Sequence, residues 1–112
     1  MSGMKPAQQA VIYVGLNDCE SHDQKFDTEK YVSVLKNVCR SYHTAFSFHT
    51  ITGGYFHEDG NYVEENTLVL TLVDVEEFIV IEIARDLCAF FHQESVMVTF
   101  SETMILFVSE AL

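Results

Sequence analysis

The sequence predicts a single α+β domain, in which two helices cover one face of an antiparallel sheet. Two segments with apolar residues at spacings of three and four, around 28–42 and 75–91, are typical of amphipathic helices. The segments around them are short, apolar and rich in β-branched residues, and Asp59-Gly60 favours a hairpin turn between two of them. The resulting order, β-α-β-β-α-β with an optional final strand, is the ferredoxin-like plan.

The first strand is predicted at 10–14 (AVIYV), where β-branched residues precede the turn-prone pair Asn17-Asp18. Asp27 or Thr28 can then cap the first helix, because either side chain accepts hydrogen bonds from the free amides of a first turn. The apolar face of this helix is expected to contain Tyr31, Val32, Leu35, Val38, Cys39 and Tyr42.

The middle of the chain is predicted to form the central hairpin. Alternation at 45–51 indicates the second strand, and Gly53-Gly54 favours a bend or a bulge after it. The third strand returns from the turn at Asp59-Gly60 and ends near Val73. Its apolar side is expected to contain Leu68, Leu70 and Leu72.

The segment 75–91 carries the strongest helical pattern. Its apolar side is expected to contain Val80, Ile83, Ala84, Leu87, Phe90 and Phe91, whereas Phe78 projects near the polar side. A fourth strand is predicted at 96–100. The run at 103–108 is either a fifth strand at the sheet edge or the continuation of the fourth strand after a bulge.

Residues 10–108 are predicted to form the domain, with 1–9 as a flexible N-terminal segment or cloning remnant and 109–112 as a C-terminal tail. The longest apolar runs are far shorter than the roughly 20 residues of a membrane helix. The first ten residues lack the apolar core of a signal peptide. We therefore expect a soluble, cytoplasmic protein.

The net charge of the chain is −11, and the acidic residues that produce it are concentrated in residues 41–112. Residues 1–40 contain five Lys or Arg and five Asp or Glu, whereas residues 41–112 contain Arg85 and twelve acids. Such a charge repels nucleic-acid backbones and anionic membranes, and it attracts basic protein surfaces. A solvated surface that only aids solubility is the alternative interpretation.

The sequence contains no motif for catalysis or metal binding. Cys19, Cys39 and Cys88 have no paired spacing, and none of the five histidines lies in an H-x-x-x-H pattern. His49 and His57 could approach each other in the hairpin, but buried thiols and surface histidines are the commoner roles. We therefore predict no metal, no cofactor and no enzymatic activity.

The acidic hairpin is the candidate site for binding a partner. Its aromatic rings and carboxylates belong to Tyr55, Glu58, Asp59, Tyr62, Glu64 and Glu65. Aromatic rings beside charges suit recognition of a basic protein groove. Because successive side chains of a strand point to opposite faces, Glu64 and Glu65 are not expected to act as one general acid/base pair.

Three segments, IYVGLND at 12–18, TGGYFHEDGNYVEENTLVLTL at 52–72 and FFHQESVMVT at 90–99, carry a resemblance to known proteins. The chain resembles a family of small proteins carried on bacterial mobile elements and prophages. The resemblance spans most of the chain and carries over no catalytic residues. In size and charge the chain is also similar to small acidic anti-CRISPR inhibitors.

The leading hypothesis is a non-enzymatic inhibitor of the anti-CRISPR type. It would occupy a basic nucleic-acid-binding surface of a host protein, such as a CRISPR effector, with its carboxylates in place of phosphates. The alternative is a small-ligand-binding or sequestering homodimer of a mobile element. A third class is a small enzyme that uses histidine and carboxylate, which three convergent polar side chains in a pocket would favour. Direct contact with nucleic acid or a membrane is not expected.

Overall fold

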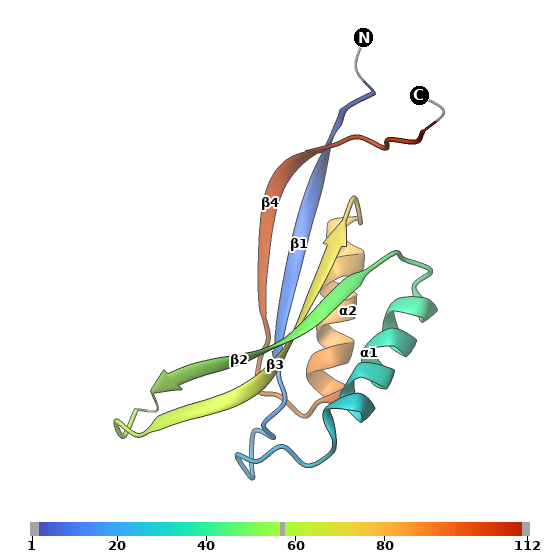
Figure 1. Cartoon of the computed structure of the whole chain (residues 1–112). Helices are drawn as coiled ribbons and strands as arrows, with labels where there is room; N and C mark the ends of the chain where they lie inside the picture. The colour runs from blue at the N-terminus through green and yellow to red at the C-terminus, as the bar shows by residue number, and fades with distance from the viewer. Residues whose placement is uncertain (1–2, 57, 111–112) are drawn as a thin grey trace.

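The computed structural model describes residues 3–56 and 58–110, and its architecture is the α+β fold predicted from the sequence. The elements are β1 (Lys5–Gly15), α1 (Thr28–Ser41), β2 (Ser47–Phe56), β3 (Tyr62–Val73), α2 (Glu77–Phe90) and β4 (Met97–Ile105). The strands form one antiparallel sheet in the order β2-β3-β1-β4. Both helices lie on the same face of it (Figure 1). The ferredoxin-like prediction is therefore confirmed.

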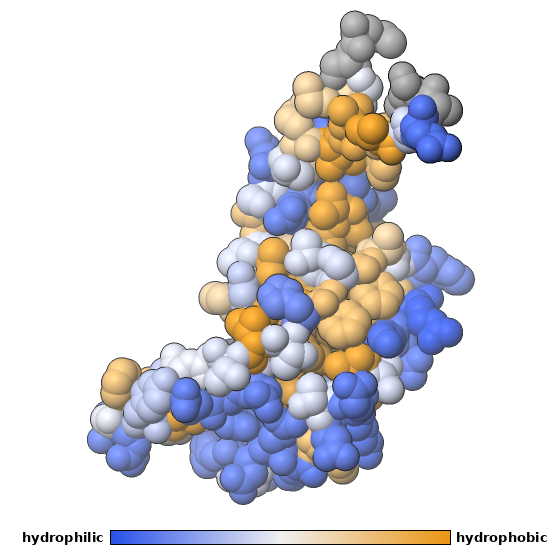
Figure 2. Space-filling view, viewed as in Figure 1, coloured by the Kyte–Doolittle hydropathy of each residue, from blue (hydrophilic) through white to orange (hydrophobic). Residues whose placement is uncertain are grey.

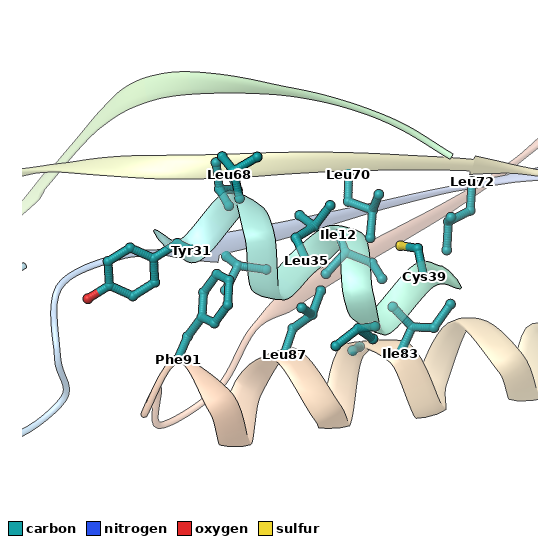
Figure 3. Packing of buried hydrophobic residues seen from close by; sticks show 14 of the residues in the cluster. Ile12, Tyr31, Leu35, Cys39, Leu68, Leu70, Leu72, Ile83, Leu87 and Phe91 are labelled. Atoms are coloured by element: carbon teal, nitrogen blue, oxygen red, sulfur yellow. The ribbon is translucent and has the colours of Figure 1, made fainter. Parts of the chain in front are cut away.

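The core lies between the helices and the inner face of the two central strands. Leu68, Leu70 and Leu72 alternate along β3 and are almost completely buried, as the period of a strand requires. Leu35 of α1 and Leu87 of α2 cover them and are fully buried as well (Figure 3). Removing one large apolar side chain from such a layer costs roughly 2–5 kcal/mol. This layer therefore holds the sheet and helices in position.

The pairing of the central strand β1 with the edge strand β4 is longer than predicted. β1 begins at Lys5, so part of the segment expected to be flexible is strand, and its pairing with β4 runs from Lys5↔Ile105 to Tyr13↔Met97. This register is unbroken, so the run after Ser101 continues β4, and the described residues hold no fifth strand or bulge there. The physical reason is the backbone pairing itself, which extends the strand beyond its apolar part.

Two local predictions are wrong, and one of the two alternatives given for Gly53-Gly54 is excluded. Asp27 occupies the N-cap position of α1, but its side chain makes no capping hydrogen bond. Phe90 is 68% exposed because Phe91 takes the core position beside Tyr31, with the two ring centroids 5.0 Å apart. A bulge at Gly53-Gly54 is excluded too, since the register of β2 against β3 continues through both glycines.

The paired ends of β1 and β4 project past the helices as an arm, which we define as residues 4–8 and 102–108 (Figure 1). The arm carries exposed apolar side chains, among them Met104, Leu106, Phe107 and Val108. Hydrophobic residues gather there in the upper part of Figure 2, whereas the opposite end is hydrophilic. The radius of gyration is 16.2 Å, against about 13 Å for a compact domain of this length.

The sheet face opposite the helices has no covering element among the described residues. Val11 and Tyr13 of β1 and Val69 of β3 lie near its centre, as the registers Val11↔Thr71 and Tyr13↔Val69 place them. Within the described part of the chain, no helix is both long enough and apolar enough to span a bilayer.

Candidate functional site

A small polar pocket lies where three chain segments meet at one end of the sheet. Its volume is about 260 Å³. The loop after β1, the hairpin strands β2 and β3, and the segment after α2 form its walls. The lining residues are Asn17, Asp18, Cys19, His22, Tyr55, Glu65, Gln93, Glu94 and Ser95. Polar side chains from separate elements converge here, which is the arrangement expected of a ligand or catalytic site.

A larger hollow, of about 640 Å³, lies against the arm between Thr44, Val75 and Phe107. Its lining is mostly apolar, and its titratable side chains are His43 and Asp74. Asp74 accepts a hydrogen bond from Lys5 across 3.0 Å, so its charge already has a partner. The smaller polar pocket is therefore the better candidate for chemistry.

Glu65 is held in a defined position at the pocket wall. It is half-buried on β3, and its Oε2 accepts a hydrogen bond from the backbone N–H of Asn17 across 3.1 Å. Its carboxylate lies over Gly15, where an added Cβ would stand 2.6 Å from both oxygens. The absence of a side chain at Gly15 lets the carboxylate approach the backbone this closely.

Asp18 is the buried charged residue of the site, with 4% of its surface exposed. Its Oδ1 accepts the backbone N–H groups of Glu20, at 2.9 Å, and Ser21, at 3.0 Å. Its Oδ2 lies 2.5 Å from Nδ1 of His92 and 3.3 Å from Nζ of Lys25. The hydrogen bonds from the Ser21 amide and from His92 hold the pKa of Asp18 well below its usual range. The carboxylate is therefore ionised at neutral pH.

Asp18, Cys19 and His92 form a group whose ligand atoms lie within 4.8 Å of one another, close enough to be tested for metal binding. Both Asp18 oxygens already accept hydrogen bonds. Burial, followed by the charges of Asp18 and Glu20, raises the pKa of the Cys19 thiol. A metal needs the thiolate, so this geometry favours a hydrogen-bonded cluster. The predicted approach of His49 to His57 falls outside the described residues at His57.

The lining of the pocket is acidic. Asp18, Glu65 and Glu94 line it, and the described lining residues include no Lys or Arg. Lys25, whose Nζ lies 3.3 Å from Oδ2 of Asp18, already partners that charge, so Glu65 and Glu94 supply the negative charge of the pocket. Tyr55 stands at its rim, where burial and then the charge of Glu65 raise the pKa of the phenol. Its hydroxyl is therefore protonated at neutral pH and can donate a hydrogen bond. A concave site with one sign of charge favours a cationic ligand.

The structure brings together two of the six residues predicted from the acidic hairpin. Tyr55 and Glu65 line the pocket. Glu64 is exposed, on the opposite side of β3 from Glu65, as the alternation of the strand predicts.

The other three lie toward the hairpin tip. The rings of Tyr62 and Phe56 pack 5.3 Å apart. Asp59 accepts hydrogen bonds from the Asn61 backbone and side chain, at 2.9 and 3.0 Å, and so stabilises the turn. Glu58 is exposed beside it. The six residues therefore do not form one site.

Sequence reasoning missed the rest of the pocket lining, which includes Asn17, Asp18, Gln93 and Glu94. One signal was present, because both segments are polar and each directly follows a regular element, β1 or α2. In this fold the end of β1 and the end of α2 lie at the same end of the sheet (Figure 1). Two polar loops at one edge often form a binding site.

Comparisons with known proteins place this fold beside several small-molecule-binding structures. A phage SAM lyase in complex with S-methyl-5'-thioadenosine matches with a TM-score of 0.68 at 21% identity, covering 89% of each chain. The Bacillus subtilis GlnK–ATP complex matches with a TM-score of 0.57 at 14% identity, covering 92% of this chain and 84% of GlnK. CPII from Thiomonas intermedia K12, bound to ADP, AMP and acetate, matches with a TM-score of 0.54 at 12% identity, covering 91% and 90%. The chain shares their fold.

No protein-family profile matches the sequence. No curated protein matches it either.

The leading hypothesis, an inhibitor of the anti-CRISPR type, is contradicted by these comparisons. The similar structures include a SAM lyase in its ligand-bound and apo states. The charge argument failed because net charge does not show where carboxylates lie, and several of them, such as Asp18 and Asp59, are engaged in internal hydrogen bonds. The fold occurs both in an enzyme and in nucleotide-bound proteins.

Proposed function

We propose that this protein binds S-adenosylmethionine (SAM) in the polar pocket and cleaves it to S-methyl-5'-thioadenosine. The observation that carries the proposal is an acidic pocket, with no Lys or Arg among its described lining residues, in a fold shared with a phage SAM lyase. The proposal replaces the expectation of a protein without enzymatic activity.

The charge of the pocket distinguishes between the ligands of the similar structures. SAM carries a sulfonium cation, whereas ATP, ADP and AMP carry phosphates. The carboxylates of Glu65 and Glu94 in the lining attract the sulfonium of SAM and repel the phosphates of the nucleotides. Nucleotide binding of the GlnK type would need cationic side chains or free backbone amides around the phosphates, so the lyase is the better-supported function.

The cleavage needs no second reactant, because all atoms and electrons of SAM are accounted for in the two products. The bond between the sulfonium sulfur and the γ-carbon of the methionyl group breaks, and sulfur keeps the electron pair to become a neutral thioether. The carboxylate of the substrate attacks the γ-carbon, and the four-carbon remainder leaves as a lactone. The protein has to bind and orient one molecule and exclude water, which are contributions of proximity and desolvation.

Two residues have defined roles in this proposal. The Glu65 carboxylate, fixed by the Asn17 amide, faces the sulfonium and favours the cationic substrate over the neutral product. Tyr55, protonated and half exposed at the rim, offers an aromatic face to the cation and a hydroxyl to the substrate.

Calorimetric titration with SAM, S-methyl-5'-thioadenosine and ATP tests the binding, and mass spectrometry of the reaction tests the cleavage. We expect SAM to bind, ATP not to bind, and thioadenosine to accumulate. Glu65→Gln removes the charge at constant size and is expected to weaken SAM binding roughly tenfold, or about 1.4 kcal/mol. Glu64→Gln, on the exposed side of the same strand, is the matched control. Absence of SAM binding, or preference for ATP, would contradict the proposal.

We also propose that the protein works as a homodimer or larger homo-oligomer, with a second copy covering the arm. The support is the set of exposed apolar side chains there, such as Phe107 at 83% and Val108 at 77%, on a segment that its own domain does not cover. Sedimentation velocity at several concentrations should give an assembly larger than one chain, and Phe107→Asp should weaken it. A monomer at every concentration would refute this part.

A further inference from the structure

The segment that follows α2 is tied to the loop that follows β1 by contacts between residues far apart in the sequence. Nε2 of Gln93 donates to the backbone oxygen of Asn17 across 2.6 Å, over a separation of 76 residues. The backbone N–H of Cys19 donates to the oxygen of His92 across 3.0 Å, and the His92 ring contacts Asp18. These contacts set the position of the loop relative to the end of α2.

The same loop holds Glu65. The N–H of Asn17 donates to Oε2 of Glu65, so the two backbone groups of one residue join Gln93 on one side to Glu65 on the other. Leu16, the preceding residue, is tied independently, because its N–H donates to the oxygen of Asn66 across 2.9 Å. Gln93 is therefore connected to the Glu65 carboxylate through the backbone of Asn17 alone, independently of the hydrogen bonds that pair the strands.

Gln93 is itself held in place. Its backbone N–H donates to the oxygen of Cys88 across 2.9 Å, and Nε2 also lies 3.3 Å from the oxygen of Phe91. Its side chain is half-buried. A side chain fixed at its base and hydrogen-bonded at its tip can position the group that it contacts.

We propose that Gln93 is a positioning residue of the pocket, which sets the orientation of the Glu65 carboxylate through the backbone of Asn17. This inference rests on the proposed function for its consequence, SAM recognition, but its geometry can be tested without any ligand. Gln93 acts through another residue and contacts no reacting atom in this scheme. The end of α2 thus determines how tightly the pocket selects a cation.

The first test measures hydrogen exchange of single backbone amides by NMR in the wild type and in Gln93→Ala. Loss of the Gln93 contact loosens the loop at Asn17, and protection of the Asn17 amide is expected to fall about tenfold or more. Protection of the Leu16 amide should stay unchanged, because this amide donates to a different acceptor, the oxygen of Asn66. Gln8→Ala, at the other end of β1, is the control for general loosening and should change neither amide. Unchanged Asn17 protection, or equal loss at both amides, overturns the inference.

The second test is a double-mutant cycle on SAM affinity with Gln93→Ala and Glu65→Gln. If Gln93 acts through the carboxylate, Gln93→Ala weakens SAM binding in the wild type and has little further effect in the Glu65→Gln background. Fully additive effects overturn the inference. If the wild type does not bind SAM at all while Asn17 protection still falls in Gln93→Ala, the proposed function is refuted and the positioning role of Gln93 is supported.

Discussion

Gly15→Ala is the sharpest single test of the site, because it adds one methyl group directly beneath the Glu65 carboxylate. Gly15 does not have a positive φ, so alanine fits the backbone and the perturbation acts through space. The group in its way is the end of a flexible side chain, which can move without disturbing the strand. The substitution therefore displaces the carboxylate and leaves the fold in place.

The size of the displacement follows from the structure. The new Cβ would stand 2.6 Å from the carboxylate oxygens, whereas ordinary contacts begin at 3.4 Å, so the carboxylate has to retreat by about 0.8 Å, the difference between the two distances. The contact of Asn17 N with Oε2, 3.1 Å in the native protein, then lengthens by up to this amount, to at most roughly 3.9 Å. The hydrogen bond to Asn17 is weakened or lost, and the carboxylate is no longer fixed in the pocket.

The expected effects on stability and function differ. A hydrogen bond to a charged group contributes roughly 1.5–3 kcal/mol, less at a half-exposed site, and alanine regains roughly 0.4–1 kcal/mol through the unfolded chain. We expect the free energy of unfolding to fall by no more than about 2 kcal/mol. A misplacement near 1 Å can cost about a hundredfold in rate, so thioadenosine formation should fall by about that factor while the protein stays folded.

Urea unfolding, calorimetry with SAM and the rate of thioadenosine formation together make the assay. Gly53→Ala is the matched control, because Gly53 pairs with Glu65 across the sheet and its added Cβ would meet Thr67 at an ordinary 3.7 Å. The control should bind and react like the wild type. If Gly15→Ala matches the wild type in affinity and rate while the wild type is active, the reasoning about the carboxylate is refuted.

Three further predictions concern stability and reactivity. The depressed pKa of Asp18 means that folding favours its ionised form, so this contribution is fully present above the ordinary value of 3.8 and is lost progressively as pH falls below that value toward the lower pKa of the folded state. Urea unfolding between about pH 5 and pH 2 should show the loss, and Asp18→Asn should flatten it. Leu70→Ala removes a fully buried side chain and should lower the free energy of unfolding by roughly 2–5 kcal/mol, whereas a loss under 1 kcal/mol would contradict the assigned core. Burial raises the pKa of the Cys39 thiol to about 11, which leaves about a thousandth as thiolate at pH 8; thiol reagents should therefore label Cys39 last, on unfolding, and rapid native labelling would argue against its burial.

Local pattern was a good guide to the fold. Leu68, Leu70 and Leu72 alternate, and Tyr31, Leu35 and Val38 recur at helical spacing, and all six are buried in the structure. Each of these predictions depends on a periodicity within one element. The failures lie at the ends of elements, as at Lys5 and Phe90, where backbone pairing with another strand or competition from a neighbouring side chain decides the outcome.

The pocket was only half predictable. The sequence predicted Tyr55 and Glu65 as site residues because of their chemistry. It predicted them, however, as contacts of a protein partner, together with residues of the hairpin tip such as Glu58. Nothing local connects Asn17 with Glu65 or Gln93, since these contacts join residues separated by 48 and 76 positions. Net charge was a poor guide for the same reason, because it sums carboxylates without regard to their neighbours.

The sequence by itself determined the class of fold, the face that each helix buries and the hairpin turn, because spacing and turn chemistry act over a few residues. Only the tertiary structure decided which carboxylate is fixed in a pocket and which remains in solvent. The physical reason is that a site is a set of distances across elements, and those distances exist only once β1, β3 and the end of α2 have packed together.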